Sequence, residues 1–412
     1  MDKPDRGAIL HGMDGDVLIV GGGPVGGTLA LALARGGLSS VLIDAAPRPA
    51  ERRFDGRAYS VAHGSMRVLR ALGLRLDAQA QPILHIKVAD GRPGTGLTSA
   101  VVHFDHAEIE EGPMGWMVED HRLRAALDDA LDAEPRIRRV LGEVAGQDTD
   151  GAATVRLASG EVLTGRLIAG ADGRRGGTAE RAGIDRDVTE YEQASLTCAV
   201  EHEHPHDATA YQIFLPPGPL AILPLTGDRS AVVWTERRAE AKRVLALDAE
   251  AYLAVLRPRF GAFLGDLRLI GERGLQPLSL VLAERLVARR VALLGDAAHG
   301  VHPVAGQGLN AGLRDVAVLA ETLTDARRRG QDPGEAAPLE AYQRWRRFDG
   351  ALTAFATDGF ARLFSNDRPG LRLLRGAGLG AVARIPALRR AFIREAAGLT
   401  GDLPRLMRGE PL

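Results

Sequence analysis

Four short runs made up entirely of apolar residues recur along the chain, at 17–20, 41–43, 167–169 and 291–294. Continuous apolar runs of this length are typical of strands that are covered on both faces of a parallel sheet. After the first and the last of these runs the sequence becomes helical, with the apolar stripe Leu309, Leu313 and Val316 in the second case. The pattern therefore predicts an α/β fold in which strand–loop–helix units build a Rossmann-like sheet.

Residues 186–276 follow a second pattern, in which apolar and polar residues alternate within short segments. Alternation predicts strands with one buried face, and turn residues such as Pro216-Pro217-Gly218 favour an inserted, mainly antiparallel sheet. Extended patterning at 82–118 predicts further strands of this second layer. We expect a discontinuous nucleotide-binding domain of residues 14–80, 114–185 and 277–335, an antiparallel sheet domain of residues 81–113 and 186–276, and a C-terminal helical region of residues 336–412.

A glycine motif follows the first apolar run directly. Gly21, Gly23 and Gly26 satisfy the spacing G-x-G-x-x-G, and Pro24 opens the predicted helix. Asp44 ends the next predicted strand 18 residues after Gly26, close to the ~20 residues expected for the acid that binds a ribose hydroxyl pair. The combination predicts a dinucleotide site and leaves NAD and FAD as alternatives, while an acid at position 44 disfavours a 2′-phosphate.

Two other predicted strand ends carry an aspartate beside a glycine. Gly295 and Asp296 follow the run at 291–294, and a loop rich in proline and glycine leads from them into a helix. Asp172 and Gly173 follow the run at 167–169. The carboxyl ends of strands are where open α/β sheets bind ligands, and the start of a helix favours an anion. An ordinary turn or a crossover loop is the alternative at each place.

Composition narrows the function classes. A net charge of −1 gives no general attraction for nucleic acid, and a single cysteine, Cys198, fits a reducing cytosol. No run approaches the ~20 apolar residues of a spanning helix, and the first 15 residues lack the apolar core of a signal peptide. We therefore predict a cytoplasmic protein. The tract 201–206 contains three histidines, but Pro205 and acidic neighbours favour a solvated loop, so no metal site is predicted.

The C-terminal part of the chain is basic. Seven arginines and no acidic residue lie between Arg368 and Arg394, and apolar residues are interleaved with them. A basic amphipathic segment can lie on an anionic membrane surface. It can equally pack on the protein with its arginines in solvent. The sequence leaves both alternatives open.

The three motifs at Gly21–Gly26, Asp172-Gly173 and Gly295-Asp296 together resemble those of the group A flavoprotein aromatic hydroxylases, which have the para-hydroxybenzoate hydroxylase fold. The resemblance covers nearly the whole chain. Within this family, the segments 218–225, 302–315 and 401–409 are similar to those of the ubiquinone-biosynthesis hydroxylases. The fold class that the resemblance implies is α/β, with a Rossmann-like FAD-binding domain, an inserted mainly antiparallel substrate domain and C-terminal helices.

The resemblance implies roles for individual residues. The glycine motif would receive the FAD pyrophosphate, Asp44 the adenosine ribose and Asp296 the ribityl chain. Arg57 matches an arginine near the flavin and phosphates, and Asp172 would contact FAD and serve reductant docking. The full set of implied cofactor-binding residues is Gly21, Gly23, Pro24, Gly26, Asp44, Arg57, Asp172, Gly295, Asp296, Pro303, Gly306, Gln307, Gly308 and Asn310.

The resemblance also implies a reaction. NADPH or NADH would reduce FAD, O2 would give a flavin hydroperoxide, and one oxygen atom would pass to the aromatic ring of a polyprenylated phenol or quinone precursor. No protein side chain is predicted as an acid or base, because the flavin carries the chemistry. The predicted substrate pocket consists of Tyr211, Ile213, Leu223, Pro224 and Pro303. A prenylated substrate resides in membrane, so the basic C-terminus would contact the inner membrane face or a ubiquinone-synthesis complex.

Three positions depart from the family pattern. Gly176 and Ala179 stand where the Asp-Gly motif usually carries serine and arginine, and Asp120 stands where asparagine usually follows Glu119. Arg174, Arg175 or Arg181 would have to compensate for the missing arginine. These departures keep two alternatives open: a non-catalytic flavoprotein scaffold of a ubiquinone-synthesis complex, and a hydroxylase of the same fold that acts on another small aromatic.

Overall fold

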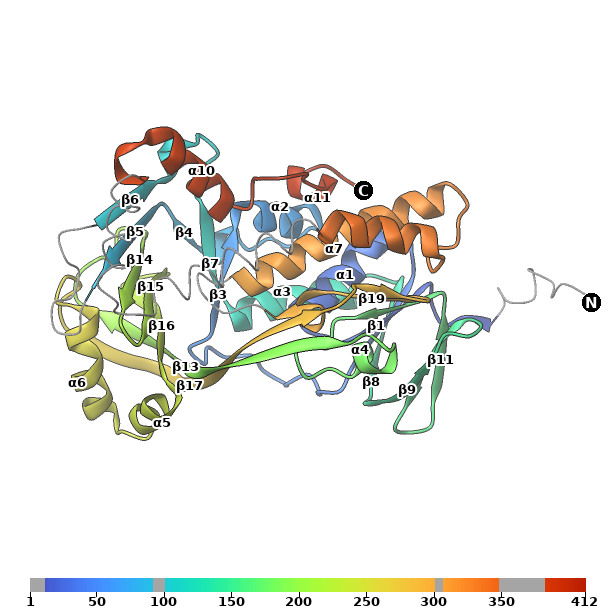
Figure 1. Ribbon diagram of the computed structural model, residues 1–412, viewed down its shortest axis with the longest axis horizontal. Helices are drawn as coiled ribbons and strands as arrows, with labels where there is room; N and C mark the ends of the chain where they lie inside the picture. Colours follow the sequence, from blue (N-terminus) through green and yellow to red (C-terminus); the bar gives the residue numbers. More distant parts are fainter. Residues whose placement is uncertain (1–11, 92–100, 301–306, 348–381) are drawn as a thin grey trace, which may run out of the picture.

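The structure is a computed structural model, and it describes residues 12–91, 101–300, 307–347 and 382–412. Two sheets dominate it, one on either side of a central group of helices (Figure 1). The predicted α/β class is confirmed, including the inserted sheet and helices near the C-terminus. Pro303 and Gly306 lie outside the described residues, as does most of the basic segment that begins at Arg368.

A six-stranded sheet forms the nucleotide-binding side of the molecule. Its strands follow the order β18-β19-β12-β1-β2-β8, and all neighbours from β19 to β8 are parallel. The apolar runs of the sequence are its central strands, and each is buried because both sheet faces are covered. The bounds are β1 (Val17–Val20), β2 (Ser40–Asp44), β8 (Ile137–Leu141), β12 (Leu167–Gly170), β18 (Val287–Ala288) and β19 (Val291–Leu293).

Different layers cover the two faces of this sheet. On one face, α1 (Pro24–Arg35) packs against both α3 (Asp120–Asp132) and α7 (Gln307–Arg328), and their apolar stripes form the main hydrophobic core. On the other face lies a three-stranded antiparallel sheet of β9 (Val144–Asp148), β10 (Ala153–Leu157) and β11 (Val162–Gly165). The parallel strands are therefore shielded from water on both sides.

An eight-stranded sheet forms the other side, in the order β20-β17-β13-β16-β15-β14-β5-β6. Every neighbouring pair is antiparallel except β14 and β5. Its two longest strands pair with each other and extend toward the first sheet (Figure 1). The bounds are β5 (His85–Asp90), β6 (Val101–Asp105), β13 (Arg186–His202), β14 (Thr209–Leu215), β15 (Gly218–Leu225), β16 (Arg229–Arg237), β17 (Leu267–Ala283) and β20 (His299–Gly300).

The two faces of the eight-stranded sheet have different coverings. One face packs on α5 (Arg238–Leu245) and α6 (Ala249–Phe260). The other packs on a small sheet of β3 (Ala58–Ala62), β7 (Gly115–Glu119) and β4 (Gln81–Ile83), and on α10 (Pro386–Ala396). The second face is therefore the one turned toward the rest of the molecule. The predicted domain boundary at 276/277 falls within the uninterrupted strand β17, and the boundaries stay predictions.

The remaining elements connect these layers. A helix, α2 (His63–Ala71), follows β3, and the C-terminal α11 (Arg405–Arg408) packs on α2 and α7. Short helices are α4 (Thr178–Arg181), η2 (Asp77–Gln79), η3 (His106–Glu108) and η4 (Gly295–Ala297). Every helix among the described residues is too short or too polar to span a lipid bilayer.

The histidine tract at 201–206 differs from its prediction as a solvated loop. His202 and His206 are buried, while His204 is exposed. The ring nitrogens of His202 lie 2.8 Å from the His204 carbonyl oxygen and 3.0 Å from Ser230 Oγ, and Nε2 of His206 lies 2.8 Å from the Leu225 carbonyl oxygen. The imidazoles of His202 and His206 therefore have a structural role, because they bond to polar atoms in the protein interior. The hydropathy of the tract did not indicate this burial.

Candidate nucleotide-binding and active site

The carboxyl ends of four parallel strands meet at one edge of the six-stranded sheet. In the register, Val20 of β1 is opposite Ile43 of β2 and Gly170 of β12, and Gly170 is opposite Leu293 of β19. Backbone hydrogen bonds continue just past the strands, from Ala171 N–H to the Val20 carbonyl and from Leu294 N–H to the Gly170 carbonyl, both within 2.9 Å. The sheet thus brings together the glycine motif, Asp44, Asp172 and Asp296, which are far apart in sequence.

The glycine motif forms a turn that side chains would not fit. Gly21 has φ +110°, and a Cβ there would lie 2.4 Å from the Ala171 carbonyl oxygen. A Cβ on Gly26 would lie 1.9 Å from the Gly21 carbonyl oxygen. Around Gly23, by contrast, the space within 4 Å of a Cβ position is open. Gly21 and Gly26 are needed to close the turn, and Gly23 leaves the outer side of the turn accessible.

The turn leads into α1 at a point suited to an anion. Gly23 is the N-cap, makes no side-chain capping bond, and is followed by Pro24 at the first helical position. The first backbone N–H groups of α1 therefore have no intrahelical acceptor, and the helix dipole adds positive charge. An open glycine turn with free N–H groups is the geometry that binds a pyrophosphate, so this part of the site fits a dinucleotide.

Asp44 lies against this turn at the end of β2. Its Oδ1 accepts a hydrogen bond of 3.1 Å from Ala46 N–H. A Cβ on Gly22 would lie 2.3 Å from Asp44 Oδ2, so the carboxylate rests directly on the glycine backbone. The distance from the pyrophosphate turn to this acid suits the adjoining ribose of a dinucleotide.

Asp296 follows β19 and is more accessible than Asp172, which follows β12. Its side chain is 37% exposed, and Oδ2 accepts a 2.9 Å hydrogen bond from Arg174 Nε. Nη1 of Arg174 also donates to the Ser279 carbonyl on β17, at 3.0 Å. A Cβ on Gly308 would lie 3.7 Å from Asp296 Oδ1, so the first turn of α7 is beside this carboxylate.

A buried charged cluster supports the backbone before Asp296. Asp315 on α7 has no exposed surface, and its Oδ2 accepts a 2.8 Å hydrogen bond from Gly295 N–H, where φ is +56°. His299 Nε2 lies 2.8 Å from the same oxygen, and Arg346 Nε donates to Oδ1 at 2.5 Å. Burial alone would raise the pKa of Asp315, but the charges of His299 and Arg346 lower it to about 2. No local pattern in the sequence indicated this cluster.

Asn310 fastens α7 to the β3–α2 junction. Its Oδ1 accepts from Ala62 N–H at 2.8 Å, and its Nδ2 donates to the Ser60 carbonyl at 2.9 Å. The side chain is buried. Gln307 begins α7, but its side chain lies outside the description. The role of these two residues toward a flavin stays a prediction.

The carboxylate of Asp172 is held by the segment that follows it in sequence. Its Oδ2 accepts hydrogen bonds from Thr178 N–H at 3.0 Å and from Thr178 Oγ1 at 2.8 Å, and its side chain is 13% exposed. A Cβ on Gly176 would lie 2.0 Å from Asp172 Cγ, so this rotamer of Asp172 requires the glycine. Arg181 Nη2 lies 3.9 Å from Oδ2, whereas Arg174 pairs with Asp296. The glycine at position 176 thus leaves room for this orientation of the Asp172 carboxylate.

Arg57 lies on the surface at the end of a chain of paired charges. Its side chain is 61% exposed and its Nη2 lies 2.7 Å from Asp55 Oδ2 and 3.4 Å from Asp120 Oδ2. Asp120 is buried and accepts from Tyr59 Oη at 2.7 Å and from Arg124 Nε at 2.8 Å. Burial and the Asp120 charge raise the pKa of Tyr59 to about 12, so the phenol keeps its proton and donates it. An aspartate at position 120 is therefore compatible with its surroundings because two arginines neutralise it.

The predicted substrate-pocket residues separate onto two faces of the eight-stranded sheet. Tyr211 and Ile213 belong to the core beneath α6, and the Tyr211 ring lies 4.5 Å from the ring of Phe263. This corrects their prediction as pocket residues, because they face away from the nucleotide-binding side. Leu223 is on the opposite face and only partly buried. The buried Pro224 next to it points back to the side of Ile222, which belongs to the core beneath α6, so its prediction as a pocket residue is corrected as well. Pro303 lies outside the described residues.

Comparisons with known proteins agree with this geometry. A family model described as an FAD binding domain matches residues 14–351. The ubiquinone hydroxylase UbiL of Rhodospirillum rubrum is 47% identical over 96% of this chain and 93% of its own length. The 3-demethoxyubiquinol 3-hydroxylase of Escherichia coli is 34% identical over 93% of this chain and 98% of its own length. The solved structure of p-nitrophenol 4-monooxygenase PnpA from Pseudomonas putida DLL-E4 is 21% identical and matches in fold, with a TM-score of 0.79 over 94% of this chain and 98% of that chain.

Proposed function

Because the chain belongs to the FAD-dependent monooxygenase family that includes the ubiquinone hydroxylases, we propose that it hydroxylates the aromatic ring of a polyprenylated quinone precursor. The substrate class rests on relatives whose names state ubiquinone hydroxylation and which match almost end to end. The observation that carries the proposal is the meeting of the glycine turn, Asp44 and Asp296 at one sheet edge, beside the start of α7. That arrangement fits FAD.

Bound FAD would supply the redox chemistry, in which electrons from NADPH or NADH activate O2 for transfer of one oxygen atom to the ring. The protein's own groups then have few tasks. The Gly21–Gly26 turn and the start of α1 would hold the pyrophosphate, and Asp44 the adenosine ribose. Asp296 would bind the ribityl hydroxyls, since its carboxylate is accessible and is oriented by Arg174. The start of α7 beside it would favour negative charge on the nearby ring system.

The eight-stranded sheet would position the aromatic ring and exclude water. Its face around Leu223 is apolar and is turned toward the β3–β7–β4 sheet. Apolar surroundings protect a reactive oxygen donor from water and favour a ring with a prenyl tail. Leu223 therefore remains the proposed pocket residue, together with Pro303.

Quinone-intermediate profiling tests the reaction. In a strain that lacks this gene, we expect one precursor with a missing ring hydroxyl to accumulate, and its structure would name the position oxidised. The wild-type gene should restore the quinone, and the Asp296→Ala variant should not, because it would lose FAD. An unchanged quinone profile after deletion would refute the proposed activity.

The non-catalytic scaffold stays a second candidate because of one observation. Asp172 is held by Thr178, and Gly176 and Ala179 replace residues of the family's reductant-docking motif. Rapid mixing of the FAD-loaded protein with NADPH or NADH without oxygen separates the two candidates. We expect the flavin absorbance to bleach when a quinone precursor is present. If neither nucleotide bleaches it with any precursor, the scaffold role is favoured.

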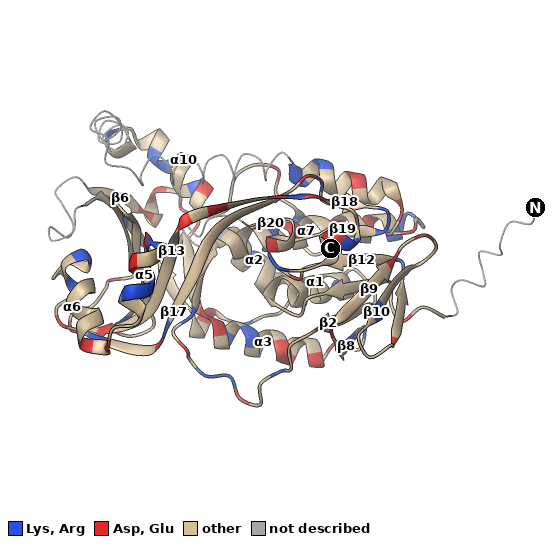
Figure 2. Ribbon diagram, turned by 60° about the horizontal axis from the view of Figure 1, so that its bottom comes forward, with Lys and Arg blue, Asp and Glu red and all other residues tan. Residues whose placement is uncertain are grey.

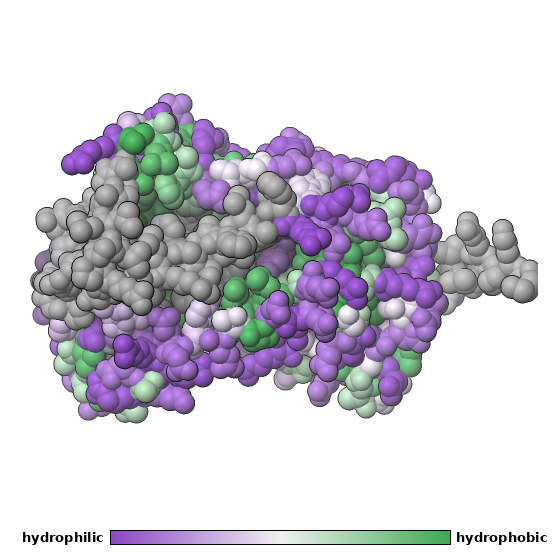
Figure 3. All heavy atoms as spheres, viewed as in Figure 1, coloured by the Kyte–Doolittle hydropathy of each residue, from purple (hydrophilic) through white to green (hydrophobic). Residues whose placement is uncertain are grey.

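We also propose that α10 contacts the membrane where a prenylated substrate resides. Ile385, Leu388 and Phe392 are 48%, 37% and 39% exposed. Figure 3 shows hydrophobic side chains gathered over α10, and Figure 2 shows basic residues on α10. Exposed apolar residues next to arginines suit an anionic lipid surface.

Liposome sedimentation tests this contact. The combined variant Arg384→Glu, Arg390→Glu and Phe392→Ser should release the protein from anionic vesicles while keeping FAD bound. Arg389 is left unchanged because it pairs with Glu108. The variant Arg243→Glu, on the distant helix α5, serves as the charge control. Equal sedimentation of wild type and combined variant would refute direct membrane contact.

A further inference from the structure

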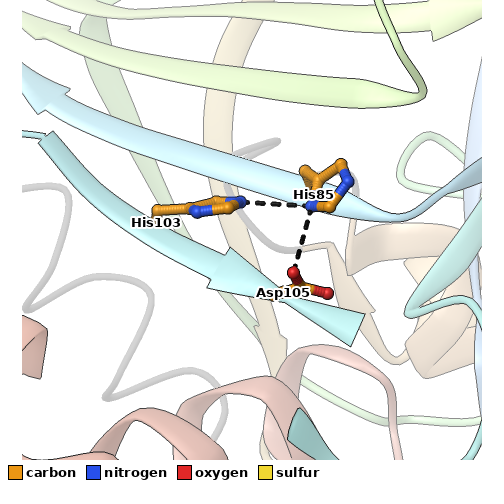
Figure 4. A group of neighbouring side chains, drawn as sticks. All are labelled: His85, His103 and Asp105. Atoms are coloured by element: carbon orange, nitrogen blue, oxygen red, sulfur yellow. Dashed lines mark hydrogen bonds and ion pairs between the residues drawn. The ribbon is translucent and has the colours of Figure 1, made fainter. Parts of the chain in front are cut away.

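Two histidines and an aspartate converge on one face of the outermost strand pair, away from the nucleotide site. His85 lies on β5, and His103 and Asp105 lie on the edge strand β6 (Figure 4). In the antiparallel register, His85 is opposite Asp105, and His103 is opposite Lys87. Side chains two residues apart on a strand share a face, so all three side chains project to the same side.

The three ligand atoms are spaced as a metal ion would need. His103 Nε2 lies 3.1 Å from His85 Nδ1, and Asp105 Oδ2 lies 3.7 Å from that same nitrogen. All three atoms lie within 4.8 Å of one another. An ion bound tetrahedrally at 2.0–2.1 Å separates its nitrogen and oxygen ligands by about 3.3–3.4 Å. The observed spacings bracket that value.

Direct hydrogen bonding satisfies this group less well than an ion would. The Nδ1 atom of His85 faces both the His103 nitrogen and the Asp105 carboxylate. If Nδ1 of His85 accepts a hydrogen bond from His103, it carries no proton of its own, so it makes no hydrogen bond to the Asp105 oxygen 3.7 Å away. A cation at the centre accepts lone pairs from all three atoms.

The neighbouring charges leave the centre available to a cation. Lys87, which would repel one, places its ammonium 5.6 Å from the centre of the Tyr211 ring. Glu108 is held by Arg389 Nε at 2.7 and 2.9 Å, so its carboxylate is already paired. An open pocket of about 590 Å³ adjoins the group and is lined in part by His103, Asp105 and Glu108, and also by Arg389, whose charge is paired with Glu108. It has room for waters that complete the coordination of an ion.

We propose that His85, His103 and Asp105 bind a divalent first-row transition-metal ion, with Zn²⁺ as the ion of choice for a two-imidazole, one-carboxylate set. This ligand set suits such ions better than Mg²⁺ or Ca²⁺, which take oxygen ligands. Since every ligand comes from the β5–β6 pair, the bound ion ties the edge strand of the eight-stranded sheet to its neighbour. The site is separate from the nucleotide-binding edge, and it adds a function that hydroxylation does not require.

Titration of the chelator-treated, FAD-loaded and tag-free protein with ZnCl2, followed by calorimetry, tests the proposal. We expect saturation at one Zn²⁺ per chain and a rise in melting temperature on adding the ion. His103→Gln should weaken binding by more than ~100-fold, because loss of a ligand exceeds the effect of losing a residue that only orients one. The isosteric Asp105→Asn should weaken it less and serves if the histidine variant does not fold.

His106→Gln is the matched control. The His106 ring lies 6.2 Å from the His85 ring, on the same surface, but it supplies none of the three ligand atoms. This variant should keep the wild-type affinity and stoichiometry. Flavin absorbance and circular dichroism of each variant check the fold. Equal Zn²⁺ affinity in wild type and His103→Gln, or binding by wild type that does not saturate, would overturn the proposal.

Discussion

The neighbouring ends of β12 and β19 carry nearly the same sequence signal, an aspartate next to a glycine, yet the two side chains have opposite surroundings. Asp172 is 13% exposed and turns back onto Thr178, while Asp296 is 37% exposed and faces the start of α7. The connection after each strand explains the difference. A short helix begins six residues after Asp172, at Thr178, and its first N–H lies within reach of the carboxylate. Asp296 keeps its carboxylate available to a ligand.

The largest expected effect on stability comes from Asp315, which supports the backbone next to Asp296. Asp315→Ala should lower the free energy of unfolding by about 3–5 kcal/mol, because it removes the buried carboxylate that pairs with Arg346 and accepts from Gly295 N–H. Chemical denaturation of the FAD-free protein measures this loss. A loss below about 1 kcal/mol would contradict the view that the buried charge of Asp315 stabilises the backbone at the end of β19, next to Asp296.

The same carboxylate predicts a pH dependence. Its folded-state pKa of about 2 lies below its ordinary value of 3.8, so its contribution is complete above about pH 4 and is lost as the pH falls toward 2. The contribution is roughly 2 kcal/mol. Unfolding curves of wild type and Asp315→Asn at about pH 6 and about pH 3 measure it. The gap between the two proteins should narrow at the lower pH, and a constant gap would contradict the prediction.

Asp172→Ala tests the end of β12, where the carboxylate is bonded to Thr178. We expect a loss of about 1–2 kcal/mol in the free energy of unfolding, because Thr178 loses the acceptor of its N–H and its hydroxyl. Thr178→Val removes only the hydroxyl bond and should cost less. If Asp172→Ala keeps full stability and instead loses FAD, then Asp172 acts on the ligand and the contrast between the two strand ends disappears.

Asp296→Ala should have the smallest effect on stability and the clearest effect on the cofactor. Its pair with Arg174 is partly exposed, so the FAD-free variant should unfold within about 0.5 kcal/mol of wild type. Its affinity for FAD should fall by roughly 10- to 150-fold, as for the loss of a hydrogen bond to a charged group, so the protein should purify nearly colourless. Absorbance of the purified protein checks this, and full FAD occupancy would refute the assignment.

The parallel sheet and its strand-end motifs could be predicted because their signals are local. Buried parallel strands are continuous apolar runs, and Gly21 and Gly26 are required by backbone contacts that any such turn has. Once the strands are known to be parallel, the convergence of Asp44, Asp172 and Asp296 follows from topology alone. The orientation of Asp172 does not follow, because it depends on where the next helix begins.

Other features depended on partners that are distant in sequence. The alternation of apolar and polar residues in β14 and β15 predicted a sheet with two different faces. It did not indicate that α6 covers the face that carries Tyr211 and Ile213. Asp315 meets Arg346 across helices, and His85 meets His103 only through the register of β5 and β6. Such contacts are set by packing rather than by spacing, so they appear only in the folded chain.

The strand order of the six-stranded sheet also sets when the nucleotide site can form during synthesis. β1 is paired on one side with β2, which follows at once, but on its other side with β12, and β12 in turn with β19. Asn310 then closes the junction at Ala62, 248 residues earlier in the chain. Contacts this distant in sequence form late, because each requires a long loop to close. The chain must therefore be synthesised beyond Asn310 before the glycine turn at Gly21–Gly26 can retain FAD.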